Sequence, residues 1–159
     1  MVWGAVWVGG RSELVIMDRD PDAPRGGYSA QSYIWALEEG LCPIYRPGAF
    51  FLQDNASIHT ARITKEWLEA HGIWVWDHPT HSPDLNPIEH VWAAMKRILS
   101  RDFPDLWSLG DNKAARAEFD EALREAWRRV PQRLIDNCIK SMPQRLTAVR
   151  RARGWYTRY

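Results

Sequence analysis

Short apolar runs alternate with amphipathic segments of helical length along this chain, and the alternation limits the folds that it can adopt. The apolar runs suit β-strands, whereas the segments between them repeat apolar residues at helical spacing. The expected strands cover residues 2–8, 13–17, 50–52 and 73–76. The expected helices cover residues 29–39, 60–71, 87–100 and 113–130, with shorter ones from about 134 to 149. Such an order predicts an α/β domain whose C-terminal part, from about residue 113, is helical.

The first two strands are expected to pair as a β-hairpin. Gly9 and Gly10 lie between two short apolar runs, which is typical of a hairpin turn. A polar loop follows, and Ser29 then begins a helix. The inner face of that helix is expected to carry Tyr33, Ile34 and Leu37.

The third strand, Phe50-Phe51-Leu52, is apolar at every position, as strands covered on both faces usually are. It ends abruptly in Gln53-Asp54-Asn55. Functional sites in open α/β sheets gather at the carboxyl ends of strands, so Asp54 is a candidate site residue. The alternative is that Asp54 only forms the turn, since Asp-Asn is a common turn pair.

Two amphipathic helices follow this strand. The helix over residues 60–71 is expected to turn Ile63, Trp67 and Leu68 inward and to stop at Gly72. A Pro-rich loop over residues 78–87 leads to the second helix. That helix is expected to carry Ile88, Val91, Trp92, Met95 and Leu99 on one side.

Glu89 falls in the first turn of the second of these helices. One interpretation is structural: Asn86 would be the N-cap, Pro87 the first helical residue, and Glu89 the partner that completes a capping box. The other interpretation pairs Glu89 with Asp54 at one site. Two carboxylates brought together repel each other unless a cation lies between them, and Mg²⁺ is the natural candidate. Such a site supports phosphodiester hydrolysis or transfer.

The charge of the chain is balanced overall but uneven along its length. It has 159 residues, of which 45% are hydrophobic, and a net charge of +1, which together predict one globular domain. The segment of residues 145–158 holds only basic charged residues, including Arg150 and Arg151. This segment either holds phosphates, which would release counterions, or is a solvated basic end.

The cysteines, the hydropathy and the histidines restrict the other classes of function. Cys42 and Cys138 show no metal-ligand spacing, and no segment reads as a signal peptide or a membrane span, so we expect an intracellular protein. A zinc site is a further alternative, although its spacing is not a standard zinc pattern. Its ligands would be His71, His78 and His81, with or without His59.

Several segments of the chain, taken together, resemble the catalytic domain of the mariner-type transposases. These are Phe51-Leu52-Gln53-Asp54-Asn55-Ala56, His59-Thr60-Ala61, Ser82-Pro83-Asp84-Leu85-Asn86-Pro87-Ile88-Glu89, Trp92 and Lys96-Arg97. Residues 1–5 and 141–146 and the last residues of the chain extend the resemblance, and 34 residues (55–88) lie between Asp54 and Glu89.

The resemblance implies a fold, a chemistry and a set of site residues. The fold would be a ribonuclease-H-like mixed sheet flanked by helices, and the activity metal-dependent cleavage and transfer of DNA strands. Asp54 and Glu89 would be the second and third acids of an Asp-Asp-acid triad that holds Mg²⁺ or Mn²⁺. Asn55 and His59 would be neighbours that shape the site, and Lys96 and Arg97 would contact the DNA backbone. The protein would act in the nucleus if its host is eukaryotic.

The chain also departs from the family pattern at its start. In the family the first Asp lies on a strand immediately before the Val-Trp-Gly segment, and here that segment is the N-terminus. We therefore expect the first strand and the first acid to be missing. The acids nearest the start all follow the hairpin turn, which argues against any of them as a substitute. These acids are Glu13, Asp18, Asp20 and Asp22.

Loss of the first strand would have structural and functional consequences. Its two neighbours would expose unpaired backbone groups, unless they pair directly or a homodimer partner or another chain supplies a strand. We expect the family's N-terminal helix-turn-helix region to be missing as well. The leading hypothesis is a transposase catalytic domain that is inactive alone. The alternative is a non-catalytic, transposon-derived module that binds nucleic acid.

Overall fold

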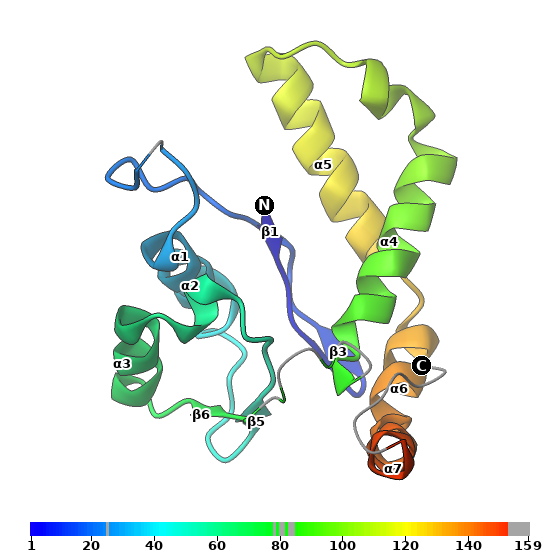
Figure 1. Cartoon of the computed structure of the whole chain (residues 1–159). Helices are drawn as coiled ribbons and strands as arrows, with labels where there is room; N and C mark the ends of the chain where they lie inside the picture. Colours follow the sequence, from blue (N-terminus) through cyan, green and yellow to red (C-terminus); the bar gives the residue numbers. More distant parts are fainter. Residues whose placement is uncertain (25, 78, 80–81, 83–84, 153–159) are drawn as a thin grey trace. The chain divides into compact units, whose positions relative to one another are not determined.

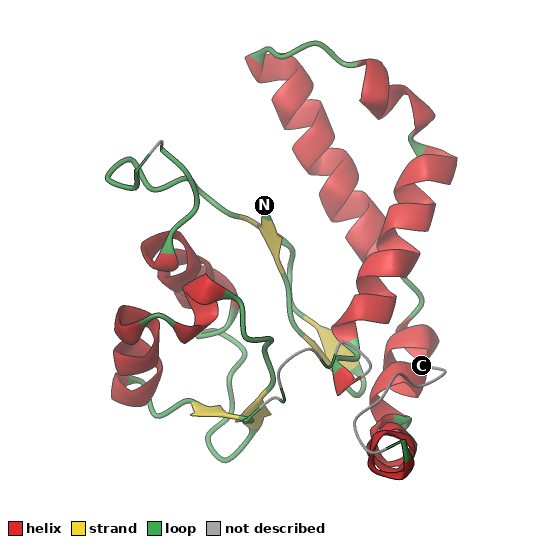
Figure 2. Ribbon diagram, in the orientation of Figure 1, coloured by secondary structure: helices red, strands yellow, loops and turns green. Residues whose placement is uncertain are grey.

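The computed structural model describes residues 1–24, 26–77, 79, 82 and 85–152 (Figure 1). The chain divides into two compact units. The first unit combines Met1–Ala5 with Val15–Asn86, and the second combines Val6–Leu14 with the chain from Pro87 onward. Helices and short strands occur together in the described residues, as the α/β prediction requires (Figure 2). Organisation as a single domain stays a prediction.

The predicted N-terminal hairpin is present. In the first unit, β1 (Val2–Trp3) pairs antiparallel with β4 (Val15–Ile16). In the second unit, β2 (Val6–Trp7) pairs antiparallel with β3 (Gly10–Arg11). Gly9 makes the turn possible, because its φ of 85° lies in the left-handed region that other residues rarely adopt.

Helix α1 (Ala30–Gly40) supplies the core of the first unit. Ser29 caps it as predicted, and a reciprocal hydrogen bond with Ser32 completes a capping box. The inward residues predicted for this helix are buried, and Trp3, Val15 and Leu68 lie in the same unit's core. Gly40 permits this packing, since a Cβ there would lie 2.3 Å from the Trp3 ring.

A parallel strand pair in the first unit positions the candidate site residues. β5 (Phe50–Phe51) pairs with β6 (Trp74–Val75), and helices α2 (Ser57–Thr60) and α3 (Arg62–Ala70) connect them. The helical stop predicted at Gly72 is confirmed by its φ of 64°.

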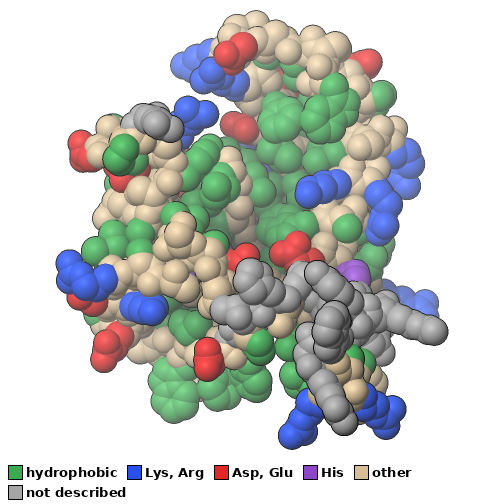
Figure 3. All heavy atoms as spheres, viewed as in Figure 1, with side chains coloured by type: hydrophobic (Ala, Val, Ile, Leu, Met, Phe, Trp, Pro, Cys, Tyr) green, Lys and Arg blue, Asp and Glu red, His purple; other side chains and the backbone are tan. Residues whose placement is uncertain are grey.

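The prediction that β5 is covered on both faces is wrong. Phe50 and Trp74 are each 61% exposed, and Trp76 is 47% exposed. Side chains alternate along a strand, so these three share one face of the pair, and the Phe50 ring lies 6.0 Å from Trp74 and 5.7 Å from Trp76. Hydrophobic side chains accordingly reach the surface over β5 and β6 (Figure 3). An apolar run alone does not distinguish packing against the core from packing among surface aromatics.

The inward face predicted for the helix after β5 is also partly wrong. Ile63 is 39% exposed, whereas Thr64 and Leu68, four residues apart, are buried. The Thr64 hydroxyl donates to the Ile58 carbonyl at 2.7 Å, which satisfies it inside the core. The hydrogen bond lets a polar residue take the inward position that periodicity assigned to its apolar neighbour.

The described strands do not include a direct pairing between β1 and β5. β1 pairs with β4 alone, and β5 with β6 alone, among the residues that the structure describes. Both strands therefore keep one edge without a described neighbour, which excludes the direct-pairing alternative for these residues. A missing first strand stays a prediction.

The second unit is built on helices. They are α4 (Ile88–Asp102), the 3₁₀ helix η2 (Pro104–Ser108), α5 (Lys113–Arg129), α6 (Gln132–Lys140) and α7 (Met142–Arg151). α4 packs against α5 and α6, and the Trp92 and Trp127 rings stack with centroids 4.9 Å apart. The predicted inner residues Val91, Met95 and Leu99 are buried. The last two helices separate at Ser141, not at Pro143, because proline fits the first turn of a helix.

The tip of the hairpin is anchored to the end of α5. The Arg11 guanidinium donates to the carbonyls of Trp127 (2.6 Å) and Val130 (2.5 Å), and the Trp127 indole donates back to the Ser12 carbonyl at 2.8 Å. The Gly9 amide donates to Asp136, which helps to hold the pKa of that carboxyl below its usual value. The β2–β3 pair, which is distant in sequence from α5 and α6, is thereby attached to the helices of the second unit.

Candidate functional site

Asp54 lies just beyond the carboxyl end of β5, where its carboxylate is held by local contacts. Its Oδ1 accepts a hydrogen bond from the Ala56 amide (3.1 Å) and lies 2.6 Å from His59 Nδ1. The turn-forming interpretation of Asp54 is thus correct. It is incomplete, because the side chain also contacts His59 and remains 52% exposed. Both contacts use Oδ1, and within the described part of the chain Oδ2 has no hydrogen-bond partner.

His59 is held in place from three sides. It projects from α2, and its ring lies against the Tyr33 ring with centroids 4.2 Å apart. The Tyr33 hydroxyl donates to Gln53 Oε1 at 2.5 Å, and Gln53 Nε2 lies 3.5 Å from the His59 carbonyl oxygen. The four side chains of Gln53, Asp54, His59 and Tyr33 therefore form one connected group. Sequence reasoning assigned Tyr33 to the core alone and missed Gln53, although Gln53 directly precedes Asp54.

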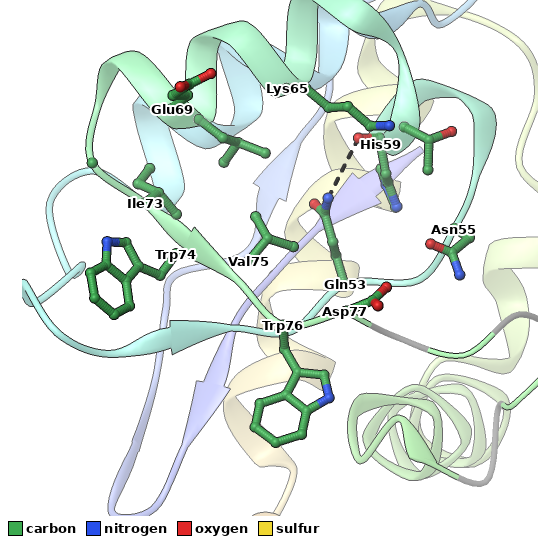
Figure 4. Close-up of a pocket in the computed structure, with 13 residues that line it drawn as sticks. Gln53, Asn55, His59, Lys65, Glu69, Ile73, Trp74, Val75, Trp76 and Asp77 are labelled. Carbon is green, nitrogen blue, oxygen red and sulfur yellow. Dashed lines mark hydrogen bonds between the residues drawn. The ribbon is translucent and has the colours of Figure 1, made fainter.

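A cavity of about 480 Å³ opens beside this group (Figure 4). Gln53, Asn55, His59 and Lys65 contribute its polar wall, and Leu68, Ile73 and Val75 its apolar floor. In Figure 4, Val75 points into the cavity, while the Trp74 and Trp76 rings point to the other side of the strand. The structure thus places Asn55 and His59 at one cavity and adds Lys65, which no motif in the sequence singled out.

Glu89 lies in the first turn of α4 and is exposed. The capping-box interpretation is wrong, because no side chain caps this helix. Pro87 takes the N-cap position with helical angles, which leaves Asn86, 7% exposed, one residue too early to cap. The Glu89 carboxylate is therefore not used to close the helix end.

The shared site of Asp54 and Glu89 stays a prediction, since the two acids belong to different units. No cluster of three or more His, Cys, Asp or Glu side chains suited to a metal occurs within the described ranges. Among the acids near the start, Asp20 serves the fold: it accepts from the Ser29 hydroxyl (2.5 Å) and the Asp22 amide (2.9 Å).

The histidine alternative for a zinc site gains no support from the residues that can be placed. His71 stacks on Trp67 with centroids 3.9 Å apart, and its Nδ1 lies 2.8 Å from the Trp67 carbonyl oxygen. His78 and His81 lie outside the described residues.

The candidate DNA-contacting residues are all exposed. Lys96 and Arg97 lie on α4, and Arg150 and Arg151 in the last turn of α7. None of the four forms an ion pair with another residue in the part of the chain that the structure covers. Their charges are thus available to a ligand. Among the described helices, none has the length and apolar character that crossing a bilayer requires.

Similarity in sequence and in fold relates the chain to known DNA transposases. Residues 24–109 match the family model of the DDE superfamily endonucleases. The Tc1 transposase of Caenorhabditis elegans is 37% identical over 127 residues, which are 79% of this chain and 41% of that protein. The chain thus spans less than half the length of the curated relatives that it matches.

Solved structures of the Mos1 mariner transposase have a similar fold. Its catalytic domain is 23% identical, with a TM-score of 0.65 over 98% of this chain and 76% of that one. The Mos1 mariner paired end complex with Mn is 26% identical, with a TM-score of 0.60 over 81% of this chain and 38% of that one.

Replacing Tyr33 by Phe is expected to change how stability depends on alkaline pH. Burial, together with the charge of Asp54, raises the pKa of the Tyr33 hydroxyl. The folded state therefore keeps a proton that the unfolded state loses near pH 10, so this stabilisation is complete below pH ~10 and is lost as pH rises further. Above that pH, wild type should lose about 1.4 kcal/mol of unfolding free energy per pH unit more than Tyr33→Phe.

Chemical denaturation at a series of pH values measures this difference. Tyr45→Phe, which also removes a phenolic hydroxyl from the first unit, is the matched control for the mutation itself. Parallel curves for wild type and Tyr33→Phe through the alkaline range would contradict the burial of Tyr33 in this group.

Proposed function

This chain belongs to the DDE superfamily endonucleases and is homologous to the Tc1/mariner transposases. We therefore propose that it forms part of the catalytic domain of a DNA transposase. Its substrate is DNA, and its reaction class is cleavage and transfer of phosphodiester strands. By the same inference the fold is ribonuclease-H-like, and the site of action in a eukaryotic host is the nucleus. The observation that carries the proposal is the position of Asp54, a half-exposed carboxylate at the carboxyl end of a parallel strand.

The residues at this position suit a hard divalent cation. Asp54 offers a carboxylate with Oδ1 engaged by His59 and Ala56, and Glu89 offers an exposed carboxylate that caps no helix. Mg²⁺ and Mn²⁺ are bound by such oxygen donors. We propose Asp54 and Glu89 as the ligands; divalent ions held there would supply charge stabilisation for an in-line displacement at phosphorus.

The other side chains of the site have supporting roles in this proposal. His59 orients the Asp54 carboxylate, and the Tyr33 ring fixes the plane of the imidazole. Asn55 lines the cavity beside them, where it would contact a DNA strand bound in that cavity. Lys96 and Arg97 hold backbone phosphates through charge, which gives affinity without sequence preference. Assembly with a second copy or another chain is part of the same proposal.

The chain by itself is expected to nick DNA poorly. The family resemblance implies a triad of three acids, of which only Asp54 and Glu89 are assigned in this chain, so we expect cation binding to be weak. We expect negligible Mg²⁺- or Mn²⁺-dependent conversion of supercoiled plasmid to open circles. Glu118→Gln, which removes an exposed acid from α5, is the control for Asp54→Asn and Glu89→Gln.

Two outcomes of the nicking assay would change the proposal. Robust nicking that disappears in Asp54→Ala would overturn the expected inactivity of the isolated chain and support the assignment of Asp54. Nicking that survives both Asp54→Asn and Glu89→Gln would remove these residues from the catalytic role.

The alternative function is a non-catalytic module that binds nucleic acid, and the exposed end of α7 favours it. Blue Lys and Arg side chains gather around the end of α7 in Figure 3, and Arg150 and Arg151 are exposed there. Phosphate contacts release counterions, so binding should weaken steeply with salt.

A DNA-binding titration tests the role of the α7 arginines. Replacing both Arg150 and Arg151 by Ala should weaken binding to duplex DNA and reduce the slope of log K against log salt by up to about 2. Arg62→Ala, which removes an arginine already paired with Glu66, is the matched control and should change neither quantity. Binding of wild type that is insensitive to salt would rule out this surface as a DNA contact.

A further inference from the structure

The buried guanidinium of Arg145 is a feature of the second unit that the proposed function does not use. Arg145 lies in α7 and is 4% exposed. Its Nε donates to Ser141 Oγ at 2.8 Å, and its Nη1 lies 3.0 Å from Nε2 of His90, in the first turn of α4. Burying a charged side chain costs free energy unless its contacts compensate. An arginine at this depth therefore indicates a contact that an apolar residue could not make.

The contact between Arg145 and His90 has a defined direction. A guanidinium can only donate hydrogen bonds, so Nε2 of His90 must accept, and the imidazole carries its proton on Nδ1. The ring is thereby fixed in one tautomer and one orientation. Because Arg145 is also bonded to Ser141, the residue that precedes its own helix, the arginine itself has little freedom to follow a moving ring.

Fixing His90 constrains its neighbour Glu89. Successive residues of an α-helix are about 100° apart around its axis, so the direction of one side chain sets that of the next. No side-chain cap holds the first turn of α4. The residue on the other side of His90, Val91, is fully buried. His90, Val91 and the buried N-cap residue Pro87 therefore anchor this turn, and among them His90 adjoins Glu89 and is held by a contact from another helix.

We propose that Arg145 is a positioning residue that, through His90, sets the direction in which Glu89 projects from α4. The importance of the Glu89 direction for metal binding rests on the proposed function. The contact through which Arg145 in α7 orients the first turn of α4 does not depend on that function. Arg145 and His90 are 55 positions apart in sequence. A buried arginine near the C-terminal end of the chain would thus orient the Glu89 carboxylate near its middle.

Backbone ¹⁵N relaxation of the 159-residue chain tests the link without any metal. In wild type the Glu89 amide should have a rigid order parameter of about 0.85. Arg145→Met and His90→Leu should lower it to about 0.6 or below. His90→Gln keeps an acceptor for the guanidinium and should restore most of the rigidity. Arg150→Met removes a charge from the same helix but no contact to His90, and should leave Glu89 unchanged.

The comparison between His90→Leu and His90→Gln decides the proposal if Arg145→Met fails to fold. A Glu89 order parameter that stays at the wild-type value in His90→Leu would overturn it. An equal loss of order throughout α5 would also overturn it, because that would mean general loosening of the unit. Since no metal is added, a failed metal site would leave this result standing, and a negative result here would leave the metal site open.

Discussion

Mutual repulsion of carboxylates is the physical constraint on which the proposed function of this chain depends. Two carboxylates about 4 Å apart repel by about 4 kcal/mol at the effective dielectric constant of a protein surface. They occupy one site only if a cation lies between them or one of them takes up a proton. Asp54 and Glu89 come from different units, and each is accessible in its own unit.

Asp54 is held by neighbouring side chains before any ion arrives. Asp54 is oriented by His59, which is backed by the Tyr33 ring and the Gln53 amide. Glu89 has no comparable side-chain contact in the described residues, and in our proposal its direction comes from the anchored neighbour His90. Prepared ligands lower the entropic cost of binding an ion, because less side-chain freedom is lost when it binds. The two acids reach this state by different means, one through direct contacts and one through the rotation of a helix.

Local signals in the sequence predicted most of the elements. The Gly9-Gly10 turn, the Ser29 cap and the stop at Gly72 all depend on short-range chemistry, and the structure has all three. Predictions that depended on packing were less successful. Phe50 is exposed and packs against aromatic partners on the same outer face of the strand pair. Ile63 is exposed because Thr64, with its hydroxyl hydrogen-bonded to the Ile58 carbonyl, takes the buried position. Neither partner can be identified from the pattern of apolar residues alone.

The site could be predicted only in part for the same reason. The family resemblance singled out Asp54 and Glu89, and the order of strand and turn placed Asp54 at a strand end. The capping role considered for Glu89 failed because Pro87, not Asn86, occupies the N-cap position. Tyr33, Gln53 and Arg145 act through contacts between segments distant in sequence, which no local spacing reveals.

Paramagnetic broadening by Mn²⁺ tests most directly whether Asp54 and Glu89 share an ion. With one shared ion, the amide signals of Asn55 and His90 should broaden over the same range of Mn²⁺ concentration. Either Asp54→Asn or Glu89→Gln alone should restore both signals, and excess Mg²⁺ should do the same by competition. If each substitution restores only the signal beside it, the two carboxylates bind separate ions, and the shared site does not exist.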